Sequence, residues 1–139
     1  DLQWIEDQDF IYTTQVNIDN PGLFEQSIIE LVFEGLDTHA RVYLNNKEIL
    51  QADNMWRTWT INVKDILQPS GNNLTIYFES AVRHDNESAK TLPFMLPCEN
   101  TRIWSRKAQY NYGWDWGPRL VTCGIWKGVY LRGMNYALL

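Results

Sequence analysis

The densest group of residues able to do chemistry lies between positions 106 and 120, in the run RKAQYNYGWDWGPRL. It combines cations, an amide, aromatic rings and one carboxylate, and a glycine lies on either side of its Trp-Asp-Trp centre. Because glycine permits sharp backbone turns, we expect Trp114, Asp115 and Trp116 to lie on a bent, protruding segment.

Two interpretations of this segment fit the residue types. A carboxylate accepts hydrogen bonds from vicinal sugar hydroxyls, and an indole face covers the apolar C–H side of a pyranose ring, so Trp114 and Asp115 are typical of a sugar subsite. In the alternative, the tryptophans fill the end of a folded domain while Asp115 pairs with Arg106 or Arg119. The pattern alone favours neither.

The histidines and cysteines predict no metal centre. Cys98 and Cys123 lack the paired spacing of zinc ligands, and His39 and His84 are far apart in the sequence with no cysteine nearby. Two free thiols are the default expectation for the cysteines, and a single disulfide is the alternative. We therefore expect neither a metal nor a cofactor.

The elements that must position these residues alternate with a period of two, as strands do. Such segments lie at 10–18, 29–33, 59–63, 74–78 and 129–131. Since helical periodicity is scarce, the pattern indicates an all-β fold, an antiparallel β-sandwich with a jelly roll as its expected form.

The sequence also predicts the form of two segments that connect strands. The pair Asn45-Asn46 predicts a tight hairpin turn, because asparagine tolerates positive φ. The stretch 81–104 is polar, poor in strand formers and contains Pro93 and Pro97, so we expect a long loop or an excursion at a sheet edge.

Composition narrows the function classes. The chain has 139 residues, of which 45% are hydrophobic and 21% charged, as in one ordinary globular domain. No uninterrupted apolar run reaches the roughly 18 residues that would span a bilayer. With 12 basic against 17 acidic residues, the net charge of -5 argues against nucleic acid as a partner.

The run 106–120, followed by GIWKGVYL at 124–131, resembles the signature of β-mannosidases of glycoside hydrolase family 2. The segment FEGLDTHARVYLN at 33–45 is similar to the sugar-binding domain of that whole family, and DNMWR at 53–57 follows in the expected order. The resemblance covers nearly all of the chain.

This resemblance implies a galactose-binding-like jelly roll that precedes an immunoglobulin-like domain and a catalytic TIM barrel. It implies that Trp114 and Asp115 contact the mannose at the terminal subsite, and that Trp116 either joins them or supports the loop. Three further matching residues are assigned to holding the loop: Arg106, Gln109 and Arg119.

We expect residues 1–139 to be one sugar-binding domain, an N-terminally truncated fragment of a larger enzyme without its immunoglobulin-like and barrel domains. A TIM barrel alone needs about 200 residues or more, and the resemblance places both catalytic glutamates of this retaining family on the barrel. We therefore assign no catalytic residue to this chain and expect the fragment alone to be inactive.

The implied partners are a mannose-terminated oligosaccharide and the barrel of the same parent chain. The parent enzyme would remove terminal β-D-mannose by exo-hydrolysis with retention. Two other functions fit the residues, an autonomous carbohydrate-binding module and a purely structural packing domain.

Overall fold

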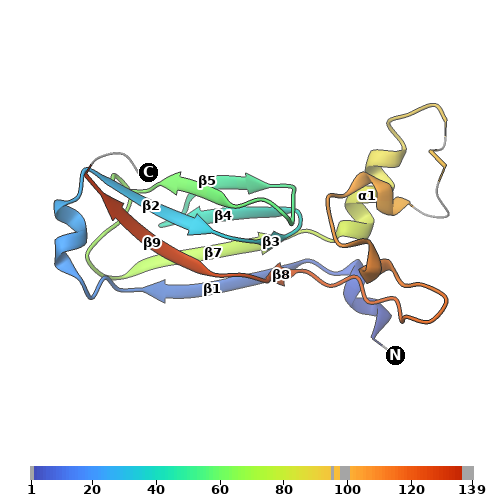
Figure 1. The fold of residues 1–139 in the computed structure, drawn as a ribbon, viewed down its shortest axis with the longest axis horizontal. Helices are drawn as coiled ribbons and strands as arrows, with labels where there is room; N and C mark the ends of the chain where they lie inside the picture. Colours follow the sequence, from blue (N-terminus) through green and yellow to red (C-terminus); the bar gives the residue numbers. More distant parts are fainter. Residues whose placement is uncertain (1, 95, 98–100, 136–139) are drawn as a thin grey trace.

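Two antiparallel sheets face each other and enclose the main core. The computed structural model describes residues 2–94, 96–97 and 101–135. The strand order is β1-β7-β4-β5 in the larger sheet and β6-β2-β9 in the smaller one (Figure 1). The larger sheet consists of β1 (Phe10–Val16), β4 (Ala40–Leu44), β5 (Lys47–Ala52) and β7 (Asn72–Phe78). The smaller sheet consists of β2 (Ile28–Phe33), β6 (Trp59–Asn62) and β9 (Val129–Met134).

The alternation in the sequence is what builds these sheets. Along β7, Leu74, Ile76 and Phe78 are buried, whereas Thr75 and Tyr77 between them are only partly covered. The register pairs Phe78 of β7 with Ala40 of β4, so buried positions lie beside buried positions. The predicted antiparallel β-sandwich is thereby confirmed.

Side chains from both sheets form one hydrophobic core. Its fully buried members of largest volume are Ile29, Phe33, Leu36, Leu44, Ile76 and Phe78. Residues 45 and 46 make the predicted tight turn between β4 and β5, with φ angles of 51° and 66°. That prediction is confirmed, because two positive φ values are what a two-residue hairpin of this type requires.

The expectation for residues 81–104 was wrong in one part. Ala81–Ala89 forms a helix, α1, which the Ser80 hydroxyl caps by accepting a hydrogen bond of 3.1 Å from the Arg83 N–H. Its buried residues are Ala81 and Asp85, so no apolar stripe of helical period marks this segment in the sequence.

Short helices and loops gather at one end of the sandwich, where α1 lies (Figure 1). Whereas the 3-10 helix η2 (Pro21–Glu25) lies at the opposite end, this end carries the 3-10 helices η1 (Gln3–Asp7), η3 (Thr101–Trp104) and η4 (Gln109–Tyr112). A two-stranded sheet of β3 (Leu36–Asp37) and β8 (Gly124–Ile125) adjoins this end. None of the helices described here has the length and apolar character needed to cross a membrane.

Cys123 is a free, partly buried thiol. Its candidate disulfide partner, Cys98, lies outside the described residues.

Candidate functional site

The predicted protruding segment is a tight turn that follows η4. The Trp114 N–H donates to the Gly117 carbonyl at 3.1 Å, and the Gly117 N–H donates to the Trp114 carbonyl at 3.1 Å. Asp115 and Trp116 therefore occupy the tip of a two-residue hairpin. Gly113 leads into it with a φ of 81°, a conformation that side-chain-bearing residues rarely adopt.

The aromatic rings of this turn face solvent. Trp114 is 57% exposed and Trp116 is 84% exposed, with their ring centroids 6.0 Å apart at an interplanar angle of 65°. Asp115 is exposed as well, and no hydrogen bond or ion pair of its carboxylate occurs among the described residues. The tryptophans thus do not fill the end of the sandwich, and Asp115 does not pair with Arg106 or Arg119.

The turn borders a hollow of about 420 Å³. Its lining combines one carboxylate, two guanidinium groups and two aromatic rings, from Asp115, Arg102, Arg119, Trp114 and Tyr112. The Arg102 guanidinium lies over the Trp114 ring at 5.6 Å from its centroid. Charged hydrogen-bonding groups beside an exposed indole ring are the donor and acceptor set that a polyhydroxylated ring requires.

Arg119 contacts both the turn and η1. Its Nε donates to Glu6 Oε2 at 2.7 Å, which ties the turn to η1, and its guanidinium lies 5.4 Å from the centroid of the Tyr112 ring. A Cβ on Gly113 would lie only 3.1 Å from the Arg119 Cβ, so the backbone of the turn passes tightly over this residue.

Gln109 and Arg106 lie further from the tip. The Gln109 side-chain amide donates to the carbonyls of Arg102 at 3.3 Å and Lys107 at 3.2 Å, joining η3 to η4. Arg106 acts through its backbone: its carbonyl accepts from the Met55 N–H at 2.9 Å, while its side chain is exposed.

A buried ion pair that the sequence did not predict anchors the start of this region. Lys107 Nζ donates to Asp37 Oδ2 at 2.6 Å and to the Thr122 carbonyl at 2.6 Å. Lys107 is 2% exposed and Asp37 is 5% exposed. The pair connects β3 to the segment that leads into η4, and so fixes the base from which the turn projects.

A second buried polar cluster surrounds Asp85 of α1. Tyr112 donates its hydroxyl to Asp85 Oδ2 at 2.7 Å, and the Ser105 hydroxyl donates to Asp85 Oδ1. Burial raises the pKa of the Asp85 carboxyl, against the opposing effect of these two hydrogen bonds. Burial also raises the pKa of Tyr112, so its hydroxyl stays a donor. The cluster links α1 to η4.

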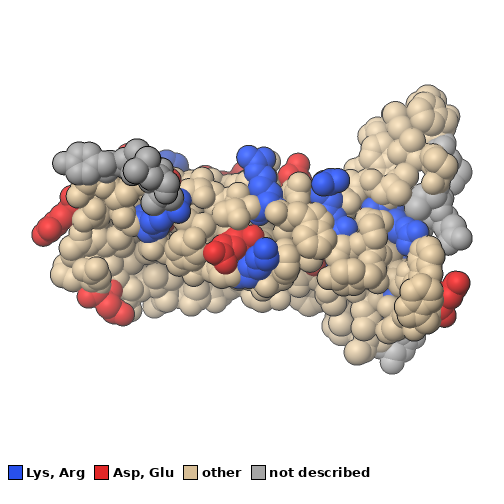
Figure 2. Space-filling model, viewed as in Figure 1, with Lys and Arg blue, Asp and Glu red and all other residues tan. Residues whose placement is uncertain are grey.

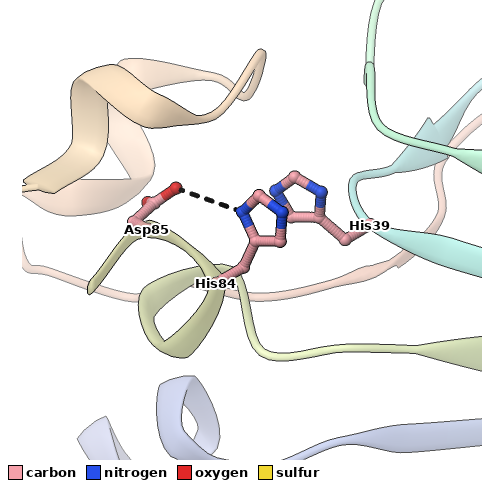
Figure 3. Close-up of side chains that lie close together, drawn as sticks. All are labelled: His39, His84 and Asp85. Carbon is pink, nitrogen blue, oxygen red and sulfur yellow. Dashed lines mark ion pairs between the residues drawn. The ribbon is translucent and has the colours of Figure 1, made fainter. Parts of the chain in front are cut away.

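Both histidines reach this cluster. His39 Nε2 lies 2.7 Å from Ser105 Oγ, and the His39 and His84 rings stack with centroids 3.5 Å apart (Figure 3). Burial, with added repulsion from His84 and Lys107, lowers the pKa of His39 to about 4. His39 is therefore neutral at pH 7. The long sequence separation of the two histidines hid this arrangement.

Acidic and basic side chains are interspersed on the face drawn in Figure 2. That mixed surface does not offer the continuous cationic stripe that a phosphate backbone requires.

The family model and the relatives that match this chain point to the same enzyme family. Residues 1–127 match the family described as glycosyl hydrolase 2 galactose-binding domain-like. The chain is 38% identical over 135 residues to beta-mannosidase B of Thermothelomyces thermophilus and 38% identical over 137 residues to that of Aspergillus oryzae. The matches cover 94% and 95% of this chain but only 16% of each relative.

A solved structure similar to this chain is also that of a β-mannosidase. The beta-D-mannosidase from Dictyoglomus thermophilum superposes with a TM-score of 0.90 at 43% identity, over 96% of this chain and 17% of that one. The chain thus spans about a sixth of the length of the relatives it matches. The chain belongs to the galactose-binding-like domain family of glycoside hydrolase family 2, and the three relatives named above are β-mannosidases.

Proposed function

We propose that this chain is the non-catalytic sugar-binding domain of a retaining β-mannosidase. The parent enzyme would remove terminal β-D-mannose from mannose-terminated oligosaccharides by exo-hydrolysis. In this proposal the turn at 113–118 projects into the substrate pocket of a catalytic TIM barrel on the same chain. The relatives support the reaction class, since those named above are β-mannosidases of which this region is about a sixth.

The observation that carries the proposal is the state of Asp115. A carboxylate and two indoles lie exposed at the tip of a hairpin, while the residues beneath them are tied down by hydrogen bonds and ion pairs. A rigid base under a tip whose carboxylate has no partner among the described residues is what a preorganised ligand contact requires, because little ordering is then left for the binding step.

The chemistry assigned to the tip is recognition. The Asp115 carboxylate would accept hydrogen bonds from two neighbouring hydroxyls of the terminal mannose, and the Trp114 ring would cover an apolar face of the sugar. Trp116, the more exposed of the two tryptophans, would reach the same sugar or the rim of the pocket. Bond cleavage would belong to two carboxyl groups about 5–5.5 Å apart on the barrel.

The test is the hydrolysis of an aryl β-D-mannoside by the whole protein that contains residues 1–139. A lost hydrogen bond to a charged group costs about 1.5–3 kcal/mol. Asp115→Ala should therefore lower kcat/KM by about 10- to 150-fold. Asp65→Ala, at another exposed carboxylate, is the matched control and should leave kcat/KM unchanged.

Two other results would each support a different function. Unchanged kcat/KM in Asp115→Ala would leave only a structural packing role. Binding of mannose by residues 1–139 alone, with a millimolar or lower Kd in calorimetry, would support an autonomous carbohydrate-binding module.

A further inference from the structure

The fold brings the only two histidines of the sequence into contact. His39 lies between β3 and β4, and His84 lies in the first half of α1. Their rings stack at 3.5 Å with an interplanar angle of 18°, although 45 positions separate them in the sequence. This juxtaposition does not belong to the exposed turn, and the function proposed above does not use it.

Nitrogen and oxygen donors converge on one small volume beside these rings. His39 Nε2 lies 2.7 Å from Ser105 Oγ, which in turn donates to Asp85 Oδ1. His84 Nδ1 lies 4.0 Å from the same carboxylate oxygen (Figure 3). One donor atom from each of His39, His84 and Asp85 lies within 4.8 Å of the other two, which occurs in no other trio of such side chains in the described ranges.

The cluster of His39, His84 and Asp85 contains a nitrogen with no hydrogen-bond partner among the described residues and a buried carboxylate. His84 Nδ1 is buried and has no hydrogen-bond partner among the described residues. Asp85 is fully buried, and its hydrogen bonds come from two hydroxyls, of Ser105 and Tyr112, rather than from a cation. The buried cation of this region, Lys107, is already paired with Asp37 at 2.6 Å. A buried carboxylate beside an unpaired imidazole nitrogen is stabilised by a bound divalent cation.

We propose that His39, His84 and Asp85 bind a divalent transition metal of the zinc class. Imidazole nitrogen and carboxylate oxygen are ligands that zinc accepts in four-coordinate sites, and the fourth position would be taken by water or by Ser105 Oγ. The His39 proton moves to Nδ1 so that the Nε2 lone pair faces the ion. Asp85 keeps its bond from Tyr112, which then acts as the outer partner of a metal ligand.

Binding needs a limited rearrangement of side chains. Bonds of about 2.0–2.1 Å place two ligands of a tetrahedral zinc ion roughly 3.3 Å apart, so donor atoms now up to 4.8 Å apart must close in. The stacked rings must also tilt, because the lone pair of each nitrogen lies in its ring plane. His84 can move, since its side chain is 36% exposed on the surface of α1.

A route to the site is present. A hollow of about 450 Å³ is lined by both histidines together with Arg41, Gln51, Asp53 and Glu79. Two carboxylates also line this hollow, those of Asp53 and of Glu79, and Glu79 is paired with Arg41 at 2.9 Å. Once bound, the ion would tie α1 to the β3–β4 connection and so stabilise the end of the sandwich that carries the exposed turn.

The experiment is a zinc titration of the purified, EDTA-treated protein, followed by calorimetry and by thermal unfolding. We expect one Zn²⁺ per chain with a Kd in the micromolar range or below, and a rise in Tm of several degrees. Co²⁺ gives a second readout, because its visible absorption changes when imidazole nitrogen enters the coordination sphere.

The variants are chosen so that the fold survives. His84→Ala changes a partly exposed side chain and should weaken zinc binding at least 100-fold while circular dichroism stays unchanged. Asp53→Asn, in the same hollow but outside the ligand set, should keep binding within about threefold. The proposal is overturned if the unsubstituted protein binds no zinc below 1 mM, or if His84→Ala binds zinc as tightly as the unsubstituted protein does. Either result leaves the role of Asp115 in sugar binding untouched.

Discussion

The buried ion pair between Lys107 and Asp37 gives the sharpest prediction about stability. Replacing Lys107 with methionine keeps most of the side-chain volume but removes the ammonium group, whose Nζ lies 2.6 Å from Asp37 Oδ2 and 2.6 Å from the Thr122 carbonyl. Asp37, at 5% exposure, would remain buried, and among the described residues its carboxylate would keep a hydrogen bond only from the Thr38 hydroxyl. Breaking a buried pair from one side costs about 3–5 kcal/mol.

The assay is urea unfolding of the whole protein, followed by tryptophan fluorescence and far-UV circular dichroism. With a denaturant slope of about 2 kcal/mol/M, Lys107→Met should lower the midpoint of the transition that reports on this domain by on the order of 2 M. Because the pair also fixes the base of the turn at 113–118, the variant should lose activity at urea concentrations that the parent tolerates.

An exposed ion pair provides the matched control. Lys90 and Glu87 lie 2.6 Å apart, with side chains 69% and 65% exposed. Surface pairs contribute about 0–1 kcal/mol, so Lys90→Met should shift the midpoint by less than about 0.5 M. Equal shifts in the two variants would refute the reasoning, since burial would then make no difference to the cost of removing the charge.

Two further predictions concern titration. In EDTA, the domain should become less stable as the pH falls from about 6.5 towards 4, because the unfolded chain takes up a proton on His39 that the folded state, with a pKa of about 4, does not bind. The loss should approach roughly 3 kcal/mol, and urea midpoints that stay level between pH 7 and pH 4.5 would contradict it. Burial raises the pKa of the Cys123 thiol to about 11, so at pH 8 its alkylation by iodoacetamide should be roughly 100-fold slower than that of an ordinary exposed thiol. Mass spectrometry of a Cys98→Ser variant measures this rate, and rapid labelling of the native protein would exclude the buried position of Cys123.

The sandwich could be predicted because its signal is local. Alternating residues such as Leu74, Ile76 and Phe78 must share one face of a strand, so burial follows directly from the sequence. The turn at residues 45 and 46 was equally local, because it depends on the backbone preference of two asparagines.

Helix α1 was not predicted from the sequence, and the reason is physical. The residue it buries deepest is Asp85, which is fully buried through hydrogen bonds to Ser105 and Tyr112 rather than through apolar contacts. The apolar contacts of the helix come from Ala81 and Val82 in its first turn. Two adjacent residues give no hydrophobic period from which a helix can be predicted. Ser80, its N-cap residue, was the one available signal.

The buried polar groups depend on contacts between distant parts of the chain. Asp37 and Lys107 are 70 residues apart, and each alone has the residue type of a solvated surface position. The local chemistry of the Trp114–Asp115 turn was readable, because glycine, indole and carboxylate are neighbours in the sequence. The exposure of the Asp115 carboxylate could not be predicted, because it depends on Arg119 pairing with Glu6 rather than with Asp115.

The contact between the turn and the sugar is tested most directly by a crystal structure of the whole protein with a bound mannose-derived inhibitor. We expect an Asp115 carboxylate oxygen within about 3 Å of a hydroxyl of the terminal mannose, with the Trp114 ring against the same sugar. A well-ordered mannose bound at the catalytic centre with both side chains more than about 6 Å away would contradict it.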